Sequence, residues 1–475
     1  MSARPLFVGG TSSNAGKSWV VTAVCAWLRR RGVRVAPFKA QTMSNHSYPC
    51  ADGGEIGRAQ VTQAEACGLS PESAMNPILL KPNGNGTSQV IVRGRVWKTL
   101  SAREYYQEVP ELRRVVLDAY AELAARFDVI LIEGAGSVSE INLRSHDLVN
   151  LELTKLIAAP WVLVADIERG GLFASVAGTL ALCDVHERRL FRGVIVNKFR
   201  GDRSLFDEGK RLLQERCGAR CLGVWPYADD VLLDAEDSLA TTTDRRTPAP
   251  PGASMAIVHV PAVSNATDFS RLTWADWITS AVPKHYDFVI LPGTKDTIGA
   301  LAWMRSRGLD AWVLAQHARG ASILGICGGF QILGERVRDP DGVETSAGEV
   351  MGLGLLPVET TLARHKVTRV RRAVTPGGVV FGAYEIHLGL TTSHETMPAF
   401  ARLDDDSPEG VRHGRVWGTY LHGALEHPAV CEELFGVTLP AAPSKAAGHA
   451  ALADWFETSL DLPADWIPGT AEFEP

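Results

Sequence analysis

The chain has 475 residues, more than one ordinary hydrophobic core accommodates, so we expect two or three domains. Its formal net charge of −6, with no block of lysine or arginine, argues against a nucleic-acid partner. No run of about 18 apolar residues occurs, and eight cysteines are scattered without Cys-x-x-Cys pairs, which argues against a membrane span, a zinc site and a disulfide framework. We therefore expect a cytoplasmic protein with reduced thiols and no membrane contact.

The first informative stretch follows a short apolar run and predicts a phosphate-binding loop. It comprises Gly10, Asn14, Gly16, Lys17 and Ser18, and it is one residue longer than the common P-loop. Backbone N–H groups and the positive end of the following apolar helix favour phosphate here. Lys17 would neutralise the terminal phosphates, and the Ser18 hydroxyl would bind Mg²⁺. A simple glycine–serine turn is the alternative, but strand, loop and helix follow one another as a P-loop requires.

Continuous apolar strands with polar residues at their ends predict a parallel sheet in the first half. The predicted strands are 34–38, 128–132, 161–165, 194–196 and 222–225. Because ligands bind at the carboxyl ends of such strands, Glu133 is a candidate Mg²⁺ ligand. Asp52 or Glu55 could supply a second carboxylate, or either could merely cap a helix.

A dense polar stretch at 41–48 predicts a loop that faces a substrate, with a solvated connection as the alternative. From their position in or just after this stretch, we take Gln41, Asn45, Tyr48 and Arg58 as candidate substrate contacts.

Several motifs of this half resemble the dethiobiotin-synthetase-like P-loop enzymes, which activate a carboxylate with ATP. The motifs are the extended P-loop, 38–41, 133–136 and 197–198. The resemblance implies that Lys39 assists the phosphates and that Asn197 contacts the adenine edge. It also implies that Glu133 shares Mg²⁺ with Ser18 and with a carboxylate at Asp52 or Glu55.

A proline-rich stretch separates two domains. Residues 241–253 contain three prolines and no apolar period, which is typical of a linker. Strands predicted at 255–260, 288–291 and 322–326 begin a second α/β domain. The predicted organisation is two doubly wound α/β domains, at 1–240 and 254–460, with a C-terminal tail at 461–475.

The second domain contains a candidate nucleophile, Cys327, between a predicted strand and a helix and next to glycines. A helix N-terminus stabilises a thiolate, and glycines let a substrate approach closely. His422, at the end of an apolar stretch, is the candidate base. A buried core cysteine and a structural histidine are the alternatives.

These residues resemble the triad-type, class I glutamine amidotransferase domains. The resemblance implies that the N–H groups of Gly293 and Gly328 bind the oxyanion. Many such domains carry a glutamate two residues after the histidine, where this chain has Ala424. We therefore expect a Cys327–His422 dyad, with Glu426 as a weak candidate to orient the histidine.

Across nearly the whole length the chain resembles the cobyric acid synthase family. The matching motifs are 53–60, 140–143, 165–171, 197–202 and 384–389, although Thr42 stands where the family usually has asparagine. The resemblance implies ATP- and glutamine-dependent amidation of the b, d, e and g carboxylates of a corrinoid, adenosylcobyrinic acid a,c-diamide, with Mg²⁺. The alternatives are cobyrinic acid a,c-diamide synthase and a nucleotide-switched P-loop ATPase with a silent amidotransferase-like domain. The sequence indicates no oligomeric state.

Overall fold

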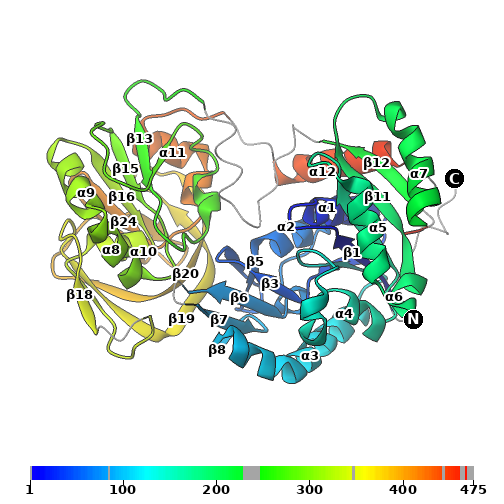
Figure 1. The fold of residues 1–475 in the computed structure, drawn as a ribbon. Helices are drawn as coiled ribbons and strands as arrows, with labels where there is room; N and C mark the ends of the chain where they lie inside the picture. Colours follow the sequence, from blue (N-terminus) through cyan, green and yellow to red (C-terminus); the bar gives the residue numbers. More distant parts are fainter. Residues whose placement is uncertain are drawn as a thin grey trace.

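The computed structural model describes residues 3–83, 86–227, 247–344, 348–440, 444–460 and 466–467. Two α/β bodies lie side by side, one formed by the first half of the chain and one by the second (Figure 1). The predicted domain end at 240, residues 241–246 of the predicted linker and most of the predicted 461–475 tail lie outside the described residues.

The first body is built on a parallel six-stranded sheet with the order β12-β11-β10-β1-β9-β2. Its strands are β1 (Arg4–Gly10), β2 (Val35–Phe38), β9 (Val129–Glu133), β10 (Trp161–Asp166), β11 (Phe191–Phe199) and β12 (Cys221–Pro226). Successive residues pack into different cores: Phe7 into one cluster, Leu6 and Val8 into another. Because both faces are buried, the strands read as continuous apolar runs, and the predicted doubly wound sheet is confirmed.

Helices cover both faces of this sheet. They are α1 (Lys17–Arg30), α2 (Arg58–Ala66), α3 (Ala102–Ala124), α4 (Leu151–Leu156), α5 (Leu172–Leu182), α6 (Val185–Leu190) and α7 (Asp207–Cys217), with short 3₁₀ turns η1 (Ser73–Met75), η2 (Ile141–His146) and η3 (Arg203–Phe206). The Ser101 side chain caps α3 by accepting from the backbone N–H of Glu104, whose carboxylate in turn binds the Ser101 N–H.

Between β2 and α3 the chain forms a small sheet and a hairpin that the sequence analysis did not predict. The sheet order is β3-β6-β7-β8, and the hairpin pairs β4 with β5. Their bounds are β3 (Gln41–Met43), β4 (Ser47–Pro49), β5 (Glu55–Gly57), β6 (Ile78–Pro82), β7 (Thr87–Val92) and β8 (Arg95–Ser101). The polar stretch 41–48 is thus partly strand rather than an open loop.

The second body contains a six-stranded sheet with the order β14-β13-β15-β16-β24-β23, parallel except for β23. Its elements are β13 (Met255–Val258), β14 (Asp276–Ile278), β15 (Phe288–Leu291), β16 (Ser322–Ile326), β23 (Val411–His413), β24 (Val416–Thr419), α8 (Thr297–Ser306), α9 (Leu309–Ala318), α10 (Gly328–Leu333), α11 (Pro428–Phe435), η4 (Ala266–Phe269) and η5 (Ala424–Glu426). The predicted second α/β domain is confirmed.

A second, mixed sheet in this body turns its longest hairpin toward the first body. Its strands are β17 (Arg336–Arg338), β18 (Glu349–Met351), β19 (Val358–Val374), β20 (Val380–Ser393), β21 (Ala401–Leu403) and β22 (Pro408–Glu409). The β19–β20 hairpin packs against β4 of the first body. In Figure 1 this hairpin lies on the side of the second body that faces the first.

The last helix, α12 (Lys445–Ser459), lies on the first body beside α1 (Figure 1). Phe456 is fully buried there, with its ring centroid 5.1 Å from Trp27 and 5.2 Å from Trp225. Arg30, the last residue of α1, and Arg31, which follows it, pair with acidic residues of α12. The predicted range 254–460 for the second domain therefore extends too far, because α12 buries its apolar side chains in the core of the first domain.

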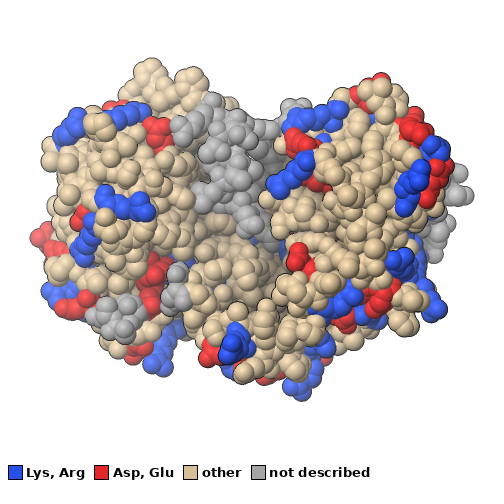
Figure 2. All heavy atoms as spheres, in the orientation of Figure 1, with Lys and Arg blue, Asp and Glu red and all other residues tan. Residues whose placement is uncertain are grey.

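The face drawn in Figure 2 carries acidic and basic side chains interspersed over both bodies. Among the described helices, none combines the length and the apolar character needed to cross a bilayer.

Candidate active sites

The P-loop connects β1 to α1, and Asn197 of β11 holds it in shape. Gly16 adopts a φ of 103°, and a Cβ there would lie 2.0 Å from Nδ2 of Asn197. That Nδ2 donates to the carbonyl oxygen of Ala15 at 2.9 Å. Asn14 also has a positive φ, 59°. Only glycine fits at position 16, and Asn197 supports the loop, while its expected contact with adenine stays a prediction.

Lys17 lies along the loop between two strand ends. Its Nζ donates to the carbonyl oxygen of Gly136 at 2.8 Å and to that of Ser12 at 3.2 Å. A Cβ on Gly10 would come within 3.0 Å of the Lys17 side chain, so glycine leaves room for the lysine stem. The ammonium group therefore lies where backbone N–H groups of the loop would bind phosphate.

Glu133, at the end of β9, is fully buried and gathers three donors. The Ser18 hydroxyl donates to Oε1 at 2.8 Å, Lys39 Nζ lies 3.0 Å from the same oxygen, and Gln63 Nε2 donates to Oε2. Burial raises the pKa of Glu133, but Lys39 and the other donors outweigh it and hold the pKa below its usual value. A carboxylate and a hydroxyl that meet at one point form a donor set suited to Mg²⁺.

Gln63 was not among the residues predicted to form this site. It lies on α2, one turn beyond the matched motif at 53–60, and no pattern of residue types marks it. Only the folded position of α2 brings its amide to Glu133.

The structure gives Glu55 another role than the predicted metal ligand. Its Oε2 accepts from Lys81 Nζ at 2.5 Å and from Ser47 Oγ at 2.8 Å, and its Oε1 pairs with Lys366 of the second body. Burial raises the pKa of Glu55, but Lys366 and Lys81 lower it by more. The pKa therefore lies well below its usual value, and the carboxylate stays ionised. Both oxygens bind ammonium groups, so Glu55 is an ion-pair partner between the domains rather than a ligand beside Ser18.

Asp52, the alternative metal ligand, also has hydrogen-bond partners for both of its carboxylate oxygens. Its Oδ1 accepts from the Gly54 N–H at 3.2 Å and its Oδ2 from the Ser73 N–H at 3.0 Å. Of the predicted carboxylates, the structure brings only Glu133 to Ser18.

Three of the four residues predicted to contact a substrate face the second body, and their contacts with a substrate stay predictions. Asn45 lines the cavity at Cys327, and the Tyr48 ring lies 4.7 Å from that of Tyr384. Arg58 is buried and pairs with Glu426.

Gln41 alone remains inside the first body, where its Oε1 accepts from the hydroxyl of Tyr105. Thr42, where this chain departs from the family, donates to Gln60 at 2.9 Å.

Cys327 lies on a sharp turn between β16 and α10. Its backbone has φ 52° and ψ −111°, an uncommon conformation for a residue other than glycine, and its N–H donates to Thr419 at 2.8 Å. Gly328 follows, and a Cβ there would lie 2.6 Å from the Thr294 side chain. Strain of this kind at a strand-to-helix turn is typical of an exposed nucleophile.

His422, the candidate general base, binds an aspartate, Asp268, that was not predicted from the sequence. Its Nδ1 lies 2.7 Å from Oδ2 of Asp268, whose Oδ1 accepts from the Gly423 N–H at 2.7 Å. Burial lowers the pKa of His422, but Asp268 and Cys327 raise it to about 10. The expected dyad is therefore extended by Asp268, and Glu426 does not orient the histidine.

Gly293 packs between the two catalytic candidates. A Cβ there would lie 2.9 Å from Cε1 of His422 and 3.6 Å from Cβ of Cys327. The structure therefore brings Gly293, Cys327 and His422 together, as predicted. The oxyanion roles of Gly293 and Gly328 stay predictions.

Both bodies line the cavity next to Cys327, which opens to solvent. Asn45 and Lys81 contribute from the first body, and Lys295, Glu344 and Lys366 are among its residues from the second. Burial is the main cause that lowers the pKa of Lys81, to about 7.

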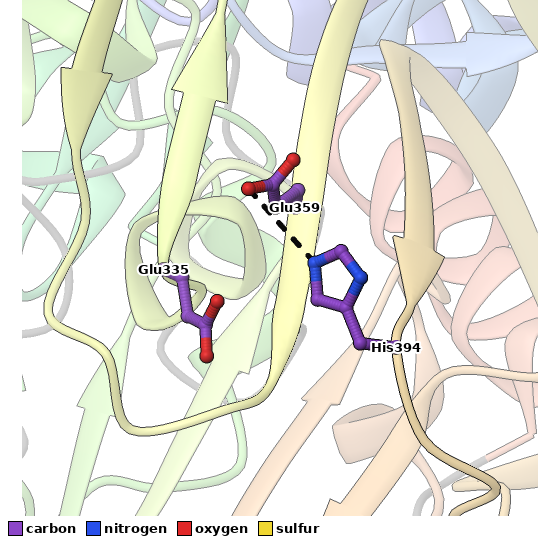
Figure 3. Close-up of side chains that lie close together, drawn as sticks. All are labelled: Glu335, Glu359 and His394. Carbon is purple, nitrogen blue, oxygen red and sulfur yellow. Dashed lines mark ion pairs between the residues drawn. The ribbon is translucent and has the colours of Figure 1, made fainter.

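A third group of polar side chains lies where β17 and β19 begin and β20 ends (Figure 3). Glu335, Glu359 and His394 hold potential metal ligands within 4.8 Å of one another. However, Glu359 already pairs with Arg338 at 2.7 Å, and two of the three are exposed, so we assign no metal there.

The chain matches two family models. Residues 6–239 match the CobQ/CobB/MinD/ParA nucleotide binding domain, which contains the P-loop and Glu133. Residues 254–430 match the CobB/CobQ-like glutamine amidotransferase domain, which contains Cys327, His422 and Asp268.

Curated relatives match almost the whole chain. Cobyric acid synthases of Roseiflexus castenholzii and Jannaschia sp. are each 43% identical to it, with 90% of both chains covered. That of Mycobacterium ulcerans is 43% identical over 97% of this chain and 94% of its own. At this identity and coverage, the chain belongs to the cobyric acid synthase family, a family of glutamine-hydrolysing carbon–nitrogen ligases.

Proposed function

We propose that this protein uses ATP and glutamine to convert the b, d, e and g carboxylates of adenosylcobyrinic acid a,c-diamide into amides, giving adenosylcobyric acid in the cytoplasm. The observation that carries the proposal is the presence, on one chain, of the P-loop cluster around Glu133 and of Cys327 beside the His422–Asp268 pair. The similarity to cobyric acid synthases over nearly the whole length supports this substrate.

The second domain supplies ammonia. The Cys327 sulfur attacks the side-chain amide carbon of glutamine, and N–H groups of Gly293 and Gly328 bind the resulting oxyanion. His422, held by Asp268, gives its proton to the nitrogen that leaves as ammonia. It then takes a proton from the water that cleaves the thioester, which releases glutamate and restores the thiol.

The first domain uses that ammonia. A substrate carboxylate attacks the γ-phosphorus of ATP, ADP leaves, and an acyl phosphate remains. Lys17 and Lys39 stabilise the negative charge that moves toward the leaving ADP. Ser18 and Glu133 would hold Mg²⁺, which supplies further charge neutralisation at the phosphates. Ammonia then displaces phosphate to give the amide.

Mass spectrometry of adenosylcobyrinic acid a,c-diamide incubated with the protein, ATP, Mg²⁺ and glutamine tests the proposal. We expect stepwise replacement of carboxyl OH by amide NH₂ that stops after the b, d, e and g positions. A protein that amidates only cobyrinic acid would instead be an a,c-diamide synthase. ATP hydrolysis with no mass change in any corrinoid would favour a nucleotide-switched ATPase.

A further inference from the structure

One continuous segment of the first body contacts both active sites. Residues 46–63, here called the bridge segment, comprise the β4–β5 hairpin and the first part of α2. Arg58 begins α2 and Gln63 lies five positions later, so the helical rise places them about 8 Å apart along one short helix.

At one end, the bridge segment binds the nucleotide cluster. Gln63 donates to Oε2 of Glu133, while Ser18 and Lys39 share the other oxygen of that carboxylate. Any exchange of partners at Glu133 therefore changes what holds this part of α2.

At the other end, Arg58 contacts the surroundings of the catalytic histidine. Its guanidinium lies 5.0 Å from the ring centroid of Tyr48 and 5.8 Å from that of Tyr384, and its Nη2 is 3.4 Å from Oε1 of Glu426. The Tyr384 ring stacks on His422 at 5.4 Å and 23°, and their backbones exchange hydrogen bonds. Glu426 ends η5, four residues after His422.

The hairpin of the bridge segment also holds the turn that carries Asp268. The Ser47 N–H donates to Oδ1 of Asn265 at 3.0 Å, and the Ala266 N–H donates to Nδ1 of His46 at 3.4 Å. Burial, assisted by Lys81, lowers the pKa of His46 to about 4, so at neutral pH its Nδ1 accepts as this bond requires. Asn265 has a φ of 53°, a strained conformation that this side-chain bond stabilises.

We propose that the bridge segment couples the two sites, so that the bonds of Glu133 control the alignment of His422 and Asp268 and hence the rate of glutamine hydrolysis. Arg58, Gln63 and Glu426 act as positioning residues. The proposal rests on the proposed function. It gives a role to the contact of Arg58 with Glu426 between the domains and to the contact of Gln63 with Glu133.

The test measures glutaminase activity of the full chain with and without Mg²⁺-ATP, and ammonia-driven amidation of the corrinoid in parallel. We expect Arg58→Ala to lower the kcat of glutamine hydrolysis about tenfold with the KM for glutamine unchanged. Arg58→Lys should recover part of this loss, because a cation again pairs with Glu426. Ammonia-driven amidation should persist.

Two further measurements isolate the positioning role. Alkylation of Cys327 by iodoacetamide in nucleotide-free protein should slow in Arg58→Ala, because the imidazolium that stabilises the thiolate is displaced. Gln63→Leu should remove the response of the glutaminase rate to Mg²⁺-ATP, because the bond between α2 and Glu133 is lost. Arg126→Ala is the matched control, since it removes a similar pair with Glu72 inside the first domain.

Wild-type glutaminase rates and wild-type ATP response in both Arg58→Ala and Gln63→Leu would overturn the coupling. So would an effect of Arg58→Ala on the KM for glutamine alone, or an equal loss of glutamine- and ammonia-driven amidation. Failure of the proposed function would show differently: the unaltered protein would amidate no corrinoid with either nitrogen source, while the glutaminase comparison would remain measurable.

Discussion

The two active sites are each organised around a buried carboxylate, but the carboxylates are held in different ways. Glu133 binds side chains from three separate elements, through Ser18, Lys39 and Gln63. Asp268 instead binds two neighbouring groups of one short segment, Nδ1 of His422 and the Gly423 N–H.

This difference indicates different tasks. Lys39 and Gln63 reach Glu133 through long side chains, and the three donors come from separate segments of the chain, so they can exchange partners when phosphates and a cation arrive. The backbone N–H that binds Asp268 cannot turn away, so Asp268 and His422 stay joined as one unit. The first site is suited to changing its bonds during a cycle, and the second to keeping this pair intact while the pair as a whole is aligned with Cys327.

Lys17→Ala should have the largest effect, because it removes a cation from the site where both nitrogen sources are used. We expect glutamine- and ammonia-driven amidation to fall by about a thousandfold or more, with glutaminase activity retained. Product formation from each nitrogen source is the measurement, and Lys98→Ala, an exposed ion-paired lysine, is the control. Substantial ammonia-driven product would show that the P-loop is not the synthetase site.

Cys327→Ala should abolish only one route. Without the sulfur no thioester forms, so glutamine-driven amidation should disappear while ammonia-driven amidation stays within about twofold of the unaltered protein. Loss of both activities in a folded variant would contradict the separation of the two sites.

Asp268→Asn sharpens the contrast between the carboxylates, because it removes the charge that most raises the pKa of His422 from 6.5 to about 10. The histidine should then lose its proton at lower pH, and glutamine hydrolysis should slow about a hundredfold. Alkylation of Cys327, followed against pH, should fall near neutrality and rise only in more alkaline solution. An unchanged alkylation profile would assign Asp268 a structural role alone.

Phe456→Ala should have the smallest effect on chemistry and a clear effect on stability. It removes a fully buried ring between Trp27 and Trp225, so we expect the first domain to lose about 3–5 kcal/mol of unfolding free energy. Denaturant unfolding measures this, with Leu205→Ala at an 80% exposed position as the control. Glutaminase activity that survives this destabilisation would confirm that Asp268 and His422 are held independently of α12.

Local patterns predicted the parts of both sites that depend on neighbours in sequence. The P-loop, the strand that ends at Glu133, and Cys327 with its glycines are each encoded within a few residues. Parallel strands buried on both faces gave long apolar runs, so both main sheets were predictable as well.

Contacts between distant segments were not predictable in the same way. Asp268 lies 154 positions from His422, in a short turn that no spacing of residues marks. Because Ala424 stands where a glutamate would complete a triad, the sequence alone predicted a dyad of Cys327 and His422. From the sequence, Glu55 resembled a metal ligand. Its ion pair with Lys366, which lies 311 positions away, forms only in the folded chain. The sequence does not indicate which domain the apolar face of α12 packs on. In the structure it packs on the first domain, beside α1.

The most direct test supplies glutamine with a heavy-nitrogen amide together with unlabelled ammonium, ATP, Mg²⁺ and the corrinoid, and measures the label in the product amides. If Cys327 feeds the site around Glu133 and Lys17, the unaltered protein should incorporate mainly heavy nitrogen, and Cys327→Ala should incorporate only unlabelled nitrogen. Equal labelling in the two proteins, or no amide in either, would contradict a single reaction shared by the two sites.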